Sequence, residues 1–538
     1  MTCKHSLTPG VSADGDRAPP AGRMTRREFV SHATTVALGM SASSTAAGGG
    51  NAARVQAGVS PIVLMSAIEL ANAIRSRTLS CTEVMSAYLD HIGRLNPKVN
   101  AIVSLQDRSD LLQQASTRDA QLAKGQYLGW MHGLPHAVKD LADTAGIRTT
   151  HGSPLLDAIP AHDTIMVERI RKQGAILIGK TNAPEFGLGS QTYNTVFGTT
   201  LNAYDQSRTS GGSSGGAAVS LALRMLPVAD GSDMMGSLRN PAAYNNVFGF
   251  RPSYGRVPVA GAELFLGQLS CSGAMGRDVG DVAMLMSVIA GPDQQAPLSI
   301  EEDPQMFRQS LERGFKGTRL GWLGDLGGYL PFEPGVLDLC RQALRAFESI
   351  GCAIEEVRLP TAPAQLWDTW VKLRHWLTAG ELDALYSDPA KRALMKPEAQ
   401  WEVEGGRSLS ALEVYRASVA RSEWYRAASA LFKQVDYLLL PSAQVFPFDA
   451  TVHWPHSING VKMDTYHRWM EVVVPASLLS GPVLNVPVGF GEHDLPMGMQ
   501  LIGRNHADFA VLQLGHAYDQ ATGWVSKRTP ALLGRVST

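Results

Sequence analysis

The stretch TSGGSSGGAAVS, residues 209–220, surrounds Ser213 and Ser214 with two pairs of glycines and leads directly into an alanine-rich run. Glycine permits backbone conformations that are closed to other residues and lets amide N–H groups approach a ligand closely. A phosphate-binding loop requires G-x-x-x-x-G-K-[ST], but no lysine follows here, and the G-x-G-x-x-G fingerprint of dinucleotide sites is also missing. The segments on both sides have the apolar pattern of buried elements, which is unlike a flexible linker. The stretch therefore predicts serines held at a tight turn before a helix, as candidates for proton transfer.

Alternating strands and helices extend outward from this turn. Short strands are expected at 134–143, 175–182 and 227–233, with helices at 164–174 and 217–226 between them. Further along, the pattern predicts a helix at 336–351 and strands at 315–325, 435–443, 481–490 and 497–503. Strands that alternate with helices indicate an α/β protein. We predict one large α/β/α layered domain with a mixed central sheet, because no change in composition separates the early strands from the late ones.

Helical segments flank this alternation. Apolar residues at helical spacing predict two helices within 66–97, ended by Asn96-Pro97, and another helix at 110–125. These form a helical N-terminal segment, and a mostly helical region at about 364–433 forms an insertion in the C-terminal half. The predicted folded domain covers residues 58–538, with its chemical core at about 130–260.

The first 57 residues differ in kind from the rest. They are rich in Ala, Gly, Ser and Thr, and the pair Arg26-Arg27 is followed by a mildly apolar stretch that is too short and too polar to span a bilayer. This pattern resembles a twin-arginine export signal with a small-residue cleavage site ending at Ala57. We expect residues 1–57 to be a signal peptide and disordered leader, without stable membrane insertion, and the protein to be periplasmic or secreted. The alternative is a cytoplasmic protein whose tail contains a chance Arg-Arg pair.

Charge and metal-ligand spacing exclude other classes of partner. Lys and Arg number 48 against 49 Asp and Glu, which leaves a formal net charge of −1 and no basic field to neutralise nucleic-acid phosphates. None of the five cysteines forms a C-x-x-C pair. The histidine pairs His132/His136 and His453/His456 lack an acidic partner at metal-ligand spacing. We expect no nucleic acid, no metal and no other cofactor.

Three segments in the middle of the chain carry candidates for chemistry. In GLPHAVKD (133–140), Lys139 ends a strand in apolar company, where partial burial lowers the pKa of an amine and frees it as a base. In GGSSGG (211–216), Ser213 lies on the glycine turn. In GSDMMGSLRNPA (231–242), Ser237 follows a strand and a glycine, and Asp233 can pair with Arg239 to brace the turn. Taken singly, each segment also has a plain structural interpretation, as a surface lysine, a tight turn or an exposed serine.

Together and in this order, the three segments resemble the amidase signature family of hydrolases. Lys139 and Ser213 are separated by 74 residues, and Ser213 and Ser237 by 24, which fits that family. Further matches are GKTNAPEF (179–186), FGFRPSYGRVP (248–258) and PMGMQLIG (496–503). The resemblance runs from about residue 66 to the C-terminus.

The resemblance implies a Ser-Ser-Lys triad. Ser237 would be the nucleophile that attacks the carbonyl carbon, Ser213 would relay a proton, and Lys139, neutral at rest, would be the ultimate base. In that family a cis peptide, here Gly212–Ser213, holds the bridging serine, and Ser214 would support it by hydrogen bonding. The implied reaction is hydrolysis of a small-molecule carboxylic amide through an acyl-enzyme, which releases a carboxylate and ammonia or an amine.

The resemblance also implies an oxyanion hole made of backbone N–H groups in the turn before and at the nucleophile, at Met234, Met235, Gly236 and Ser237. The family usually has two glycines before the nucleophile, whereas this chain has Met234-Met235-Gly236. Backbone donors survive a change of side chain. If the replaced glycine has a positive φ, however, Met235 would be strained.

Substrate contacts are expected from the 190–210 loop and from the 364–480 region. The candidates are Gln191, Thr192, Trp454, Tyr466 and Trp469. Core packing is the alternative role for the aromatic residues, and if several of them line an acyl pocket, a bulky or aromatic substrate is favoured.

Three other functions stay open on the sequence. The same triad can hydrolyse carbamates or esters. An amidotransferase subunit that supplies ammonia to a tRNA-bound substrate would need partner subunits and a cytoplasmic location, which the export signal opposes. A binding protein without activity is disfavoured because Lys139, Ser213 and Ser237 are all present. The family often forms dimers, so the resemblance allows a homodimer, although the sequence leaves the oligomeric state open.

Overall fold

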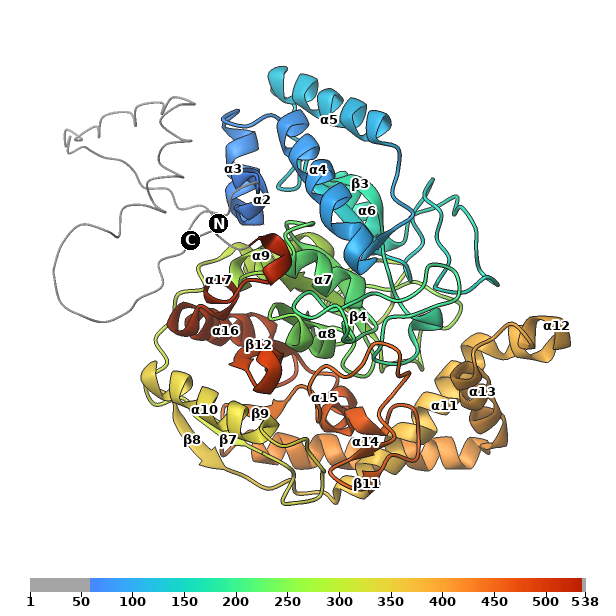
Figure 1. Cartoon of the computed structure of the whole chain (residues 1–538). Coiled ribbons are helices and arrows are strands. Elements are labelled where there is room, and N and C mark those ends of the chain that lie inside the picture. Colours follow the sequence, from blue (N-terminus) through green and yellow to red (C-terminus); the bar gives the residue numbers. More distant parts are fainter. Residues whose placement is uncertain (1–58, 535–538) are drawn as a thin grey trace, which may run out of the picture. The chain divides into compact units, whose positions relative to one another are not determined.

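An eight-stranded sheet lies at the centre of the computed structural model, which describes residues 59–534 (Figure 1). β7 pairs in parallel with β8 and β9, and the other neighbouring strands pair antiparallel, so the sheet is mixed, as predicted. The expected leader, 1–57, lies outside the described residues. From one edge to the other, the strands are β4 (Ala229–Asp233), β6 (Cys271–Gly276), β5 (Phe248–Arg251), β12 (Val483–Phe490), β13 (Pro496–Ile502), β9 (Tyr437–Pro441), β7 (Arg319–Trp322) and β8 (Ala353–Glu356).

Helices cover both faces of this sheet. Successive residues of its central strand β12 point to opposite faces, and both sets of side chains are covered. Leu484 packs directly on Gly515, whereas its neighbour Asn485 donates a hydrogen bond to Val247 O, on the side of α8 (3.0 Å). The predicted α/β/α layered fold is confirmed. The helices that contact the sheet are α8 (Arg239–Tyr244), backed by α7 (Gly215–Ala222), and on the other side α9 (Val279–Ile289), α10 (Val336–Ser349) and α16 (Asp508–Thr522).

A second, three-stranded sheet contains the strand that ends at Lys139. Its strand order is β1-β3-β2, with β2 and β3 parallel. The carboxylate of Asp230, on β4 of the large sheet, accepts a hydrogen bond from Lys139 N (3.2 Å) and lies 2.9 Å from His136 Nε2. A buried side chain thus joins the two sheets beside the candidate base. The three strands are β1 (Ile102–Val103), β3 (Ile176–Thr181) and β2 (Pro135–Lys139).

The N-terminal helices form largely where the sequence predicts them. Capping boxes at Ser66 and Ser80 start the two helices expected within 66–97. The second of them continues through Pro97 to Val99, beyond the predicted end, because a proline in the last turn removes only one hydrogen bond. It ends at Asn100, which has a φ of +53°. The helices are α2 (Pro61–Leu64), α3 (Ala67–Arg75), α4 (Cys81–Val99), α5 (Arg108–Ala123) and α6 (Ile165–Lys172).

In the predicted helical insertion, helix α11 reaches the turn that follows β4, where Arg374 of α11 contacts Met234. The long α11 packs against α13, α14 and α15. No helix within residues 59–534 combines the length and the apolar character that crossing a membrane requires. The insertion contains α11 (Pro363–Ser387), α12 (Pro389–Arg392), α13 (Pro397–Ser408) and α14 (Ala411–Leu431), and the remaining elements are the β10 (Ser457–Ile458) and β11 (Val461–Lys462) hairpin, α15 (Val474–Leu479) and α17 (Trp524–Lys527).

Candidate active site

Lys139 lies at the end of β2, a strand whose five residues are all buried. Its Nζ lies 2.8 Å from both Ser213 Oγ and Ser214 Oγ, and 3.0 Å from Ser232 Oγ. A neutral amine has two N–H donors and one lone pair, so it can donate to two of these hydroxyls and accept from the third. The structure therefore brings Lys139 together with Ser213 and Ser214, and adds Ser232, which the sequence did not single out.

The ionisation of Lys139 is governed by burial. Removal from water disfavours the charged ammonium and lowers its pKa to about 7, although Asp230 and Asp233 oppose this shift. The direction agrees with the expectation from its apolar neighbours in the sequence. Near neutral pH a substantial fraction of the amine is unprotonated, which is the form a general base requires.

Close backbone approaches shape the turn that carries Ser213. Gly211 has a φ of +71°, and a Cβ on Gly212 would lie 3.0 Å from Gln191 N. Thr192 Oγ1 donates to Gly211 O (2.9 Å) and accepts from Gly215 N (3.2 Å). The Gly212–Ser213 peptide bond is cis. Glycine at 211 and 212 is therefore required by space and conformation, and the Thr192 hydroxyl holds the turn.

Asp233, the last residue of β4, organises the turn before Ser237. Its carboxylate accepts a hydrogen bond from Gly236 N (2.8 Å) and two from the Arg239 guanidinium (2.9 Å each). Arg251 Nη1 lies 3.3 Å from the same carboxylate. Burial alone raises the pKa of this carboxyl, but the two guanidinium groups outweigh it and hold the pKa well below its usual range. The expected pairing of Asp233 with Arg239 is present and fully buried.

The four backbone N–H groups expected to form an oxyanion hole are not equivalent. The N–H of Gly236 donates to Asp233, so it is not free to bind an oxyanion. Among residues 59–534, the N–H groups of Met234, Met235 and Ser237 find no hydrogen-bond acceptor. The positive φ of this turn falls on Gly236 (+80°) and not on Met235, so the condition for strain at Met235 is not met.

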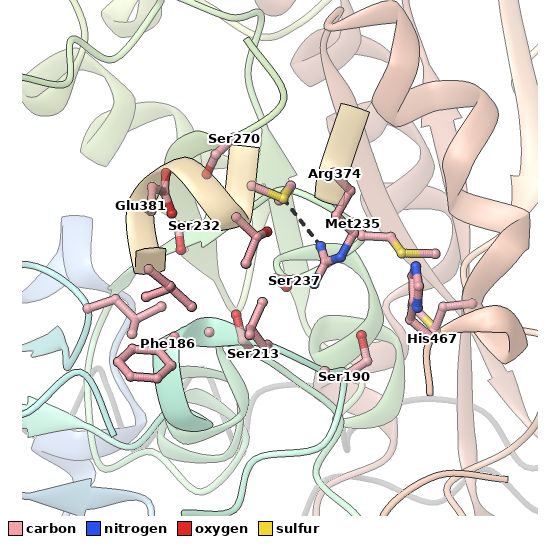
Figure 2. A pocket seen from close by; sticks show the side chains of 18 residues that line it. Phe186, Ser190, Ser213, Ser232, Met235, Ser237, Ser270, Arg374, Glu381 and His467 are labelled. Carbon is pink, nitrogen blue, oxygen red and sulfur yellow. Dashed lines mark hydrogen bonds between the residues drawn. The ribbon is translucent and has the colours of Figure 1, made fainter. Parts of the chain in front are cut away.

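A cavity of about 140 Å³ opens beside the two turns (Figure 2). Ser213 and Ser237 both line it, and the backbone joins their turns because Ser214 N donates to Ser237 O (3.2 Å). The cavity draws on the 364–480 region, as expected, but it only touches the edge of the 190–210 loop at Ser190. Other lining residues include Leu141, Phe186, Leu188, Ser232, Met234, Met235, Ser270, Arg374, Thr378, Glu381, Leu382, His467 and Met470.

One face of α11 forms a wall of the cavity; it lies in the region that the sequence predicted, but its residues were not among the candidates. Arg374, Thr378 and Glu381 are spaced by four and then three residues, so they lie on one face of the helix. Arg374 is buried, whereas Glu381 is exposed. Other charged residues, such as Asp368 and Lys372, occur along the same helix, so the spacing of polar residues in the sequence did not single out this face.

Arg374 is held in place by a buried ion pair. Its Nε donates to Glu402 Oε1 (2.5 Å), and its Nη2 donates to Tyr466 OH (2.6 Å), which in turn donates to the same carboxylate oxygen (2.6 Å). Burial opposes ionisation of Glu402, but Arg374 outweighs it and keeps the pKa of this carboxyl well below its usual range. The third guanidinium nitrogen, Nη1, donates to Met234 Sδ (3.2 Å; Figure 2).

His467 lies beside this ion pair and also lines the cavity. It is 4% exposed, and neither of its ring nitrogens has a hydrogen-bond partner within residues 59–534. Burial, followed by the charge of Arg374, lowers its pKa to about 3, so the imidazole is neutral at physiological pH. Its ring lies against Tyr466 and Trp367, with centroids 4.7 and 5.0 Å away.

The two loop residues proposed for substrate binding do not line the cavity. Gln191 Nε2 donates to Ala450 O (2.8 Å), and Thr192 holds the glycine turn. Both side chains are buried, and Gln191 Oε1 has no hydrogen-bond partner within the described residues. Thr192 thus positions the turn, and a substrate contact by either residue stays a prediction.

The three aromatic residues proposed for the pocket do not line it either. Tyr466 and Trp469 are buried, and Trp469 Nε1 donates to Tyr466 O (3.1 Å). Trp454 packs against His456, with ring centroids 4.2 Å apart. Packing thus accounts for Tyr466 and Trp469, as in the alternative interpretation, and because none of the three rings lines the cavity, they give no support for a bulky aromatic substrate.

No group of three or more His, Cys, Asp and Glu side chains in the described part of the chain is arranged to hold a metal ion. His132 Nε2 lies 3.0 Å from Arg118 O, and the His453 ring stacks on Tyr193 with centroids 4.4 Å apart. Together with His136, which contacts Asp230, these histidines are engaged with protein groups.

A buried lysine whose amine contacts serine hydroxyls beside a cavity is an arrangement suited to an enzyme that uses a serine nucleophile. Comparison with known proteins identifies the family. A family model described as Amidase matches residues 83–512. The chain therefore belongs to the amidase signature family of enzymes.

Named relatives include both amide hydrolases and components of a larger assembly. The chain is 35% identical to a subunit of the glutamyl-tRNA(Gln) amidotransferase of Thermus thermophilus over 491 residues, which covers 86% of this chain and 99% of that protein. It is 31% identical to an acylamidase of Rhodococcus erythropolis over 470 residues, with 86% and 97% covered. The crystal structure of a bacterial aryl acylamidase matches with a TM-score of 0.82 and 28% identity, over 89% of this chain and 100% of that one.

Proposed function

We propose that this protein hydrolyses carboxylic amides through an acyl-enzyme, with Ser237 as nucleophile, Ser213 as proton relay and Lys139 as base. The observation that carries the proposal is the 2.8 Å contact between the buried Lys139 Nζ and Ser213 Oγ, at a cavity that Ser237 also lines. The lowered pKa of Lys139 supports a neutral amine as the resting state. Similarity to an acylamidase and to an aryl acylamidase supports amides as the substrate class.

In the proposed first step, Ser237 Oγ attacks the carbonyl carbon while its proton passes to Ser213 and the Ser213 proton passes to Lys139. The carbonyl oxygen becomes an oxyanion, and the backbone N–H groups near Met235 and Ser237 are available to stabilise it. Lys139 then returns the proton through Ser213 to the nitrogen of the leaving group, and the C–N bond breaks. Water hydrolyses the resulting ester by the same route and releases the carboxylate.

The test is a Ser237→Ala variant assayed against primary amides, anilides and peptide amides, with detection of the released ammonia or amine. We expect turnover to be lost while the circular dichroism spectrum and the unfolding midpoint stay unchanged. Ser422→Ala, which removes an exposed hydroxyl on α14, is the matched control and should retain full activity. Amide hydrolysis that survives Ser237→Ala would refute the proposed mechanism.

Esters and carbamates are alternative substrates for the same groups, because the attack on the carbonyl carbon does not depend on the leaving atom. Paired aryl amides, esters and carbamates that share one acyl group distinguish these activities. The proposal requires that kcat/KM for the amide be lowered by Ser237→Ala to the same degree as that for the ester.

A role as an amidotransferase subunit is the second candidate, and the 35% identity to such a protein favours its consideration. That role requires partner proteins, whereas an amidase acts alone. Hydrolysis of simple amides by the purified chain, with kcat unaffected by added cell extract, would support the amidase. Activity that appears only with partners would support the role in an assembly.

We further propose that the protein is exported through the twin-arginine route, on the basis of Arg26-Arg27 and the apolar stretch that follows. A fusion of residues 1–57 to a folded reporter should reach the periplasm, and changing both arginines to lysine should retain it in the cytoplasm. Whether the protein acts as a homodimer is a separate expectation from the resemblance, which light scattering of the purified protein would decide.

A further inference from the structure

Two polar side chains that line the cavity, Arg374 and His467, lack the strong hydrogen-bond partners that buried polar groups normally have. Arg374 Nη1 donates to the sulfur of Met234, and a thioether is a weak acceptor for a charged guanidinium. His467 has two ring nitrogens without partners in the described residues, although only 4% of the residue is exposed. Buried polar groups are almost always hydrogen-bonded, so unpaired groups that face a cavity indicate what the ligand must supply.

The charges around the cavity select the kind of ligand. Glu402 already neutralises Arg374 through a 2.5 Å contact, and the carboxylate of Glu381 lies on the same face of α11, about 10 Å along the helix. The neutral imidazole of His467 adds no positive charge. A carboxylate placed here would thus bring an uncompensated negative charge into a buried site, which is costly. A neutral group avoids that cost and still makes the hydrogen bonds.

We propose that the acyl portion of the substrate carries a neutral hydrogen-bonding group, such as a carboxamide or a hydroxyl, that is bound by Arg374 Nη1 and His467. The oxygen of this group replaces the Met234 sulfur as acceptor. A neutral imidazole has one N–H donor and one acceptor nitrogen on different sides of the ring, so the nitrogen that faces the cavity can either donate to the oxygen of this group or accept from its N–H or O–H. This inference rests on the proposed amide hydrolysis and names the substrate class within it.

The size of the cavity limits the acyl portion. A cavity of about 150 Å³ is known to accommodate benzene, and this one has a volume of about 140 Å³. A short acyl chain that ends in one polar group fills such a space. Met235, Leu382 and Phe186 supply the apolar surface along which its methylene groups lie.

The test compares three amides of one amine whose acyl chains have the same length and shape but end in a carboxamide, an isopropyl group or a carboxylate. We expect kcat/KM to be about tenfold or more higher for the carboxamide than for the isopropyl compound, because the apolar end leaves the Arg374 and His467 groups unpaired. The carboxylate should be the poorest substrate. A preference for the isopropyl or the carboxylate compound overturns the proposal.

His467→Phe tests the assignment of the preference to this residue. The change keeps an aromatic ring between Tyr466 and Trp367 and breaks no hydrogen bond within the described residues, so the variant should fold. We expect the ratio between the carboxamide and the isopropyl compound to fall toward one, because the carboxamide loses its partner at this position whereas the isopropyl group has none to lose. His516→Phe, outside the cavity, is the matched control and should leave the ratio unchanged. A ratio unaltered by His467→Phe refutes the role of His467.

A binding measurement separates this inference from the proposed function. Calorimetric titration of the Ser237→Ala variant with the intact amides measures the preference without turnover. Tighter binding of the carboxamide supports the inference even if the catalytic assignment to Ser237 fails. Equal binding of the three compounds overturns it, even if Ser237→Ala has abolished hydrolysis as expected.

Discussion

The turns that bring Ser213 and Ser237 to the cavity, together with Lys139 behind Ser213, form one side of the site, which we call the catalytic wall after the roles proposed above. The side built from α11 and residues 467–470, which we call the helical wall, contributes Arg374 and His467. On the catalytic wall the Lys139 amine has three hydroxyl neighbours, and Asp233 is matched by two guanidinium groups. On the helical wall, by contrast, a guanidinium nitrogen contacts a sulfur and an imidazole has no partner in the described residues.

This difference separates two requirements of an enzyme. Groups that move protons must be held at defined distances, and saturated hydrogen bonding provides that rigidity. Groups that recognise a substrate must have hydrogen-bond donors or acceptors that are unpaired in the free protein, because the bound ligand supplies their partners. The predictions below challenge this distinction, beginning with the change that should have the largest effect.

Replacing Lys139 with methionine should lower kcat/KM for amides by about 10³-fold, since general base catalysis contributes about 10²–10⁴ to the rate. Steady-state kinetics on a good amide substrate measures the loss. Lys172→Met, at an exposed lysine of α6, is the control and should keep full activity. A Lys139→Met protein that retains more than a tenth of the activity would contradict the role of the catalytic wall.

Replacing Asp233 with alanine should lower the free energy of unfolding by about 3–5 kcal/mol, because Arg239 and Arg251 would be left buried without their shared carboxylate. Urea denaturation followed by fluorescence measures the change. Asp368→Ala removes an exposed partner of Lys372 and should cost less than about 1 kcal/mol. Similar losses for the two variants would show that the Asp233 pairings do not stabilise the turn.

The pH dependence of activity should follow the amine of Lys139. Its pKa is lowered to about 7, and the active form is the neutral amine, so kcat/KM should rise about tenfold per pH unit below 7 and level off above it. A buffer series from pH 5 to 9, restricted to conditions in which the protein stays folded, gives the profile. A rate that decreases as the pH rises through 7 would exclude the neutral amine as the base.

The smallest effect is expected outside both walls. Trp454 packs against His456 and does not line the cavity, so Trp454→Ala should change kcat/KM by less than about twofold and leave the preference among acyl groups unaltered. Kinetics with the three amides of matched shape provides the measurement. A change in preference as large as that of His467→Phe would place Trp454 in the pocket. It would also show that the helical wall is not what sets the preference among acyl groups.

The residues of the catalytic wall were predicted because three short segments in a fixed order resemble the amidase signature family. A lysine at the end of a buried strand, serines within a run of glycines and a serine after a strand and a glycine are each local features. The contacts that support Ser213 confirm that glycine is needed there, since Gly212 approaches the backbone of Gln191 and Gly211 has a positive φ. Ser232 escaped prediction because its approach to Lys139 depends on how β2 and β4 lie together.

One reason explains why the five residues proposed for the pocket do not line the cavity: Gln191, Thr192, Trp454, Tyr466 and Trp469. Residue type and position along the chain do not reveal whether a side chain points into a cavity or into the core. Thr192 is directed to the glycine turn, and Tyr466 to an ion pair behind the wall. Only packing decides between these outcomes.

Short-range sequence patterns were thus sufficient for the layered α/β architecture and the helical insertion, because backbone conformation and strand ends are governed by neighbouring residues. The candidate catalytic residues came from the resemblance of three short segments to the amidase signature family. The shape and charge of the acyl pocket required the folded protein. Arg374 meets Glu402 and Tyr466 across long separations in the chain, and His467 lies against Trp367 of α11 without a hydrogen-bond partner in the described residues. Such long-range contacts depend on the packing of whole helices, and no local pattern encodes them.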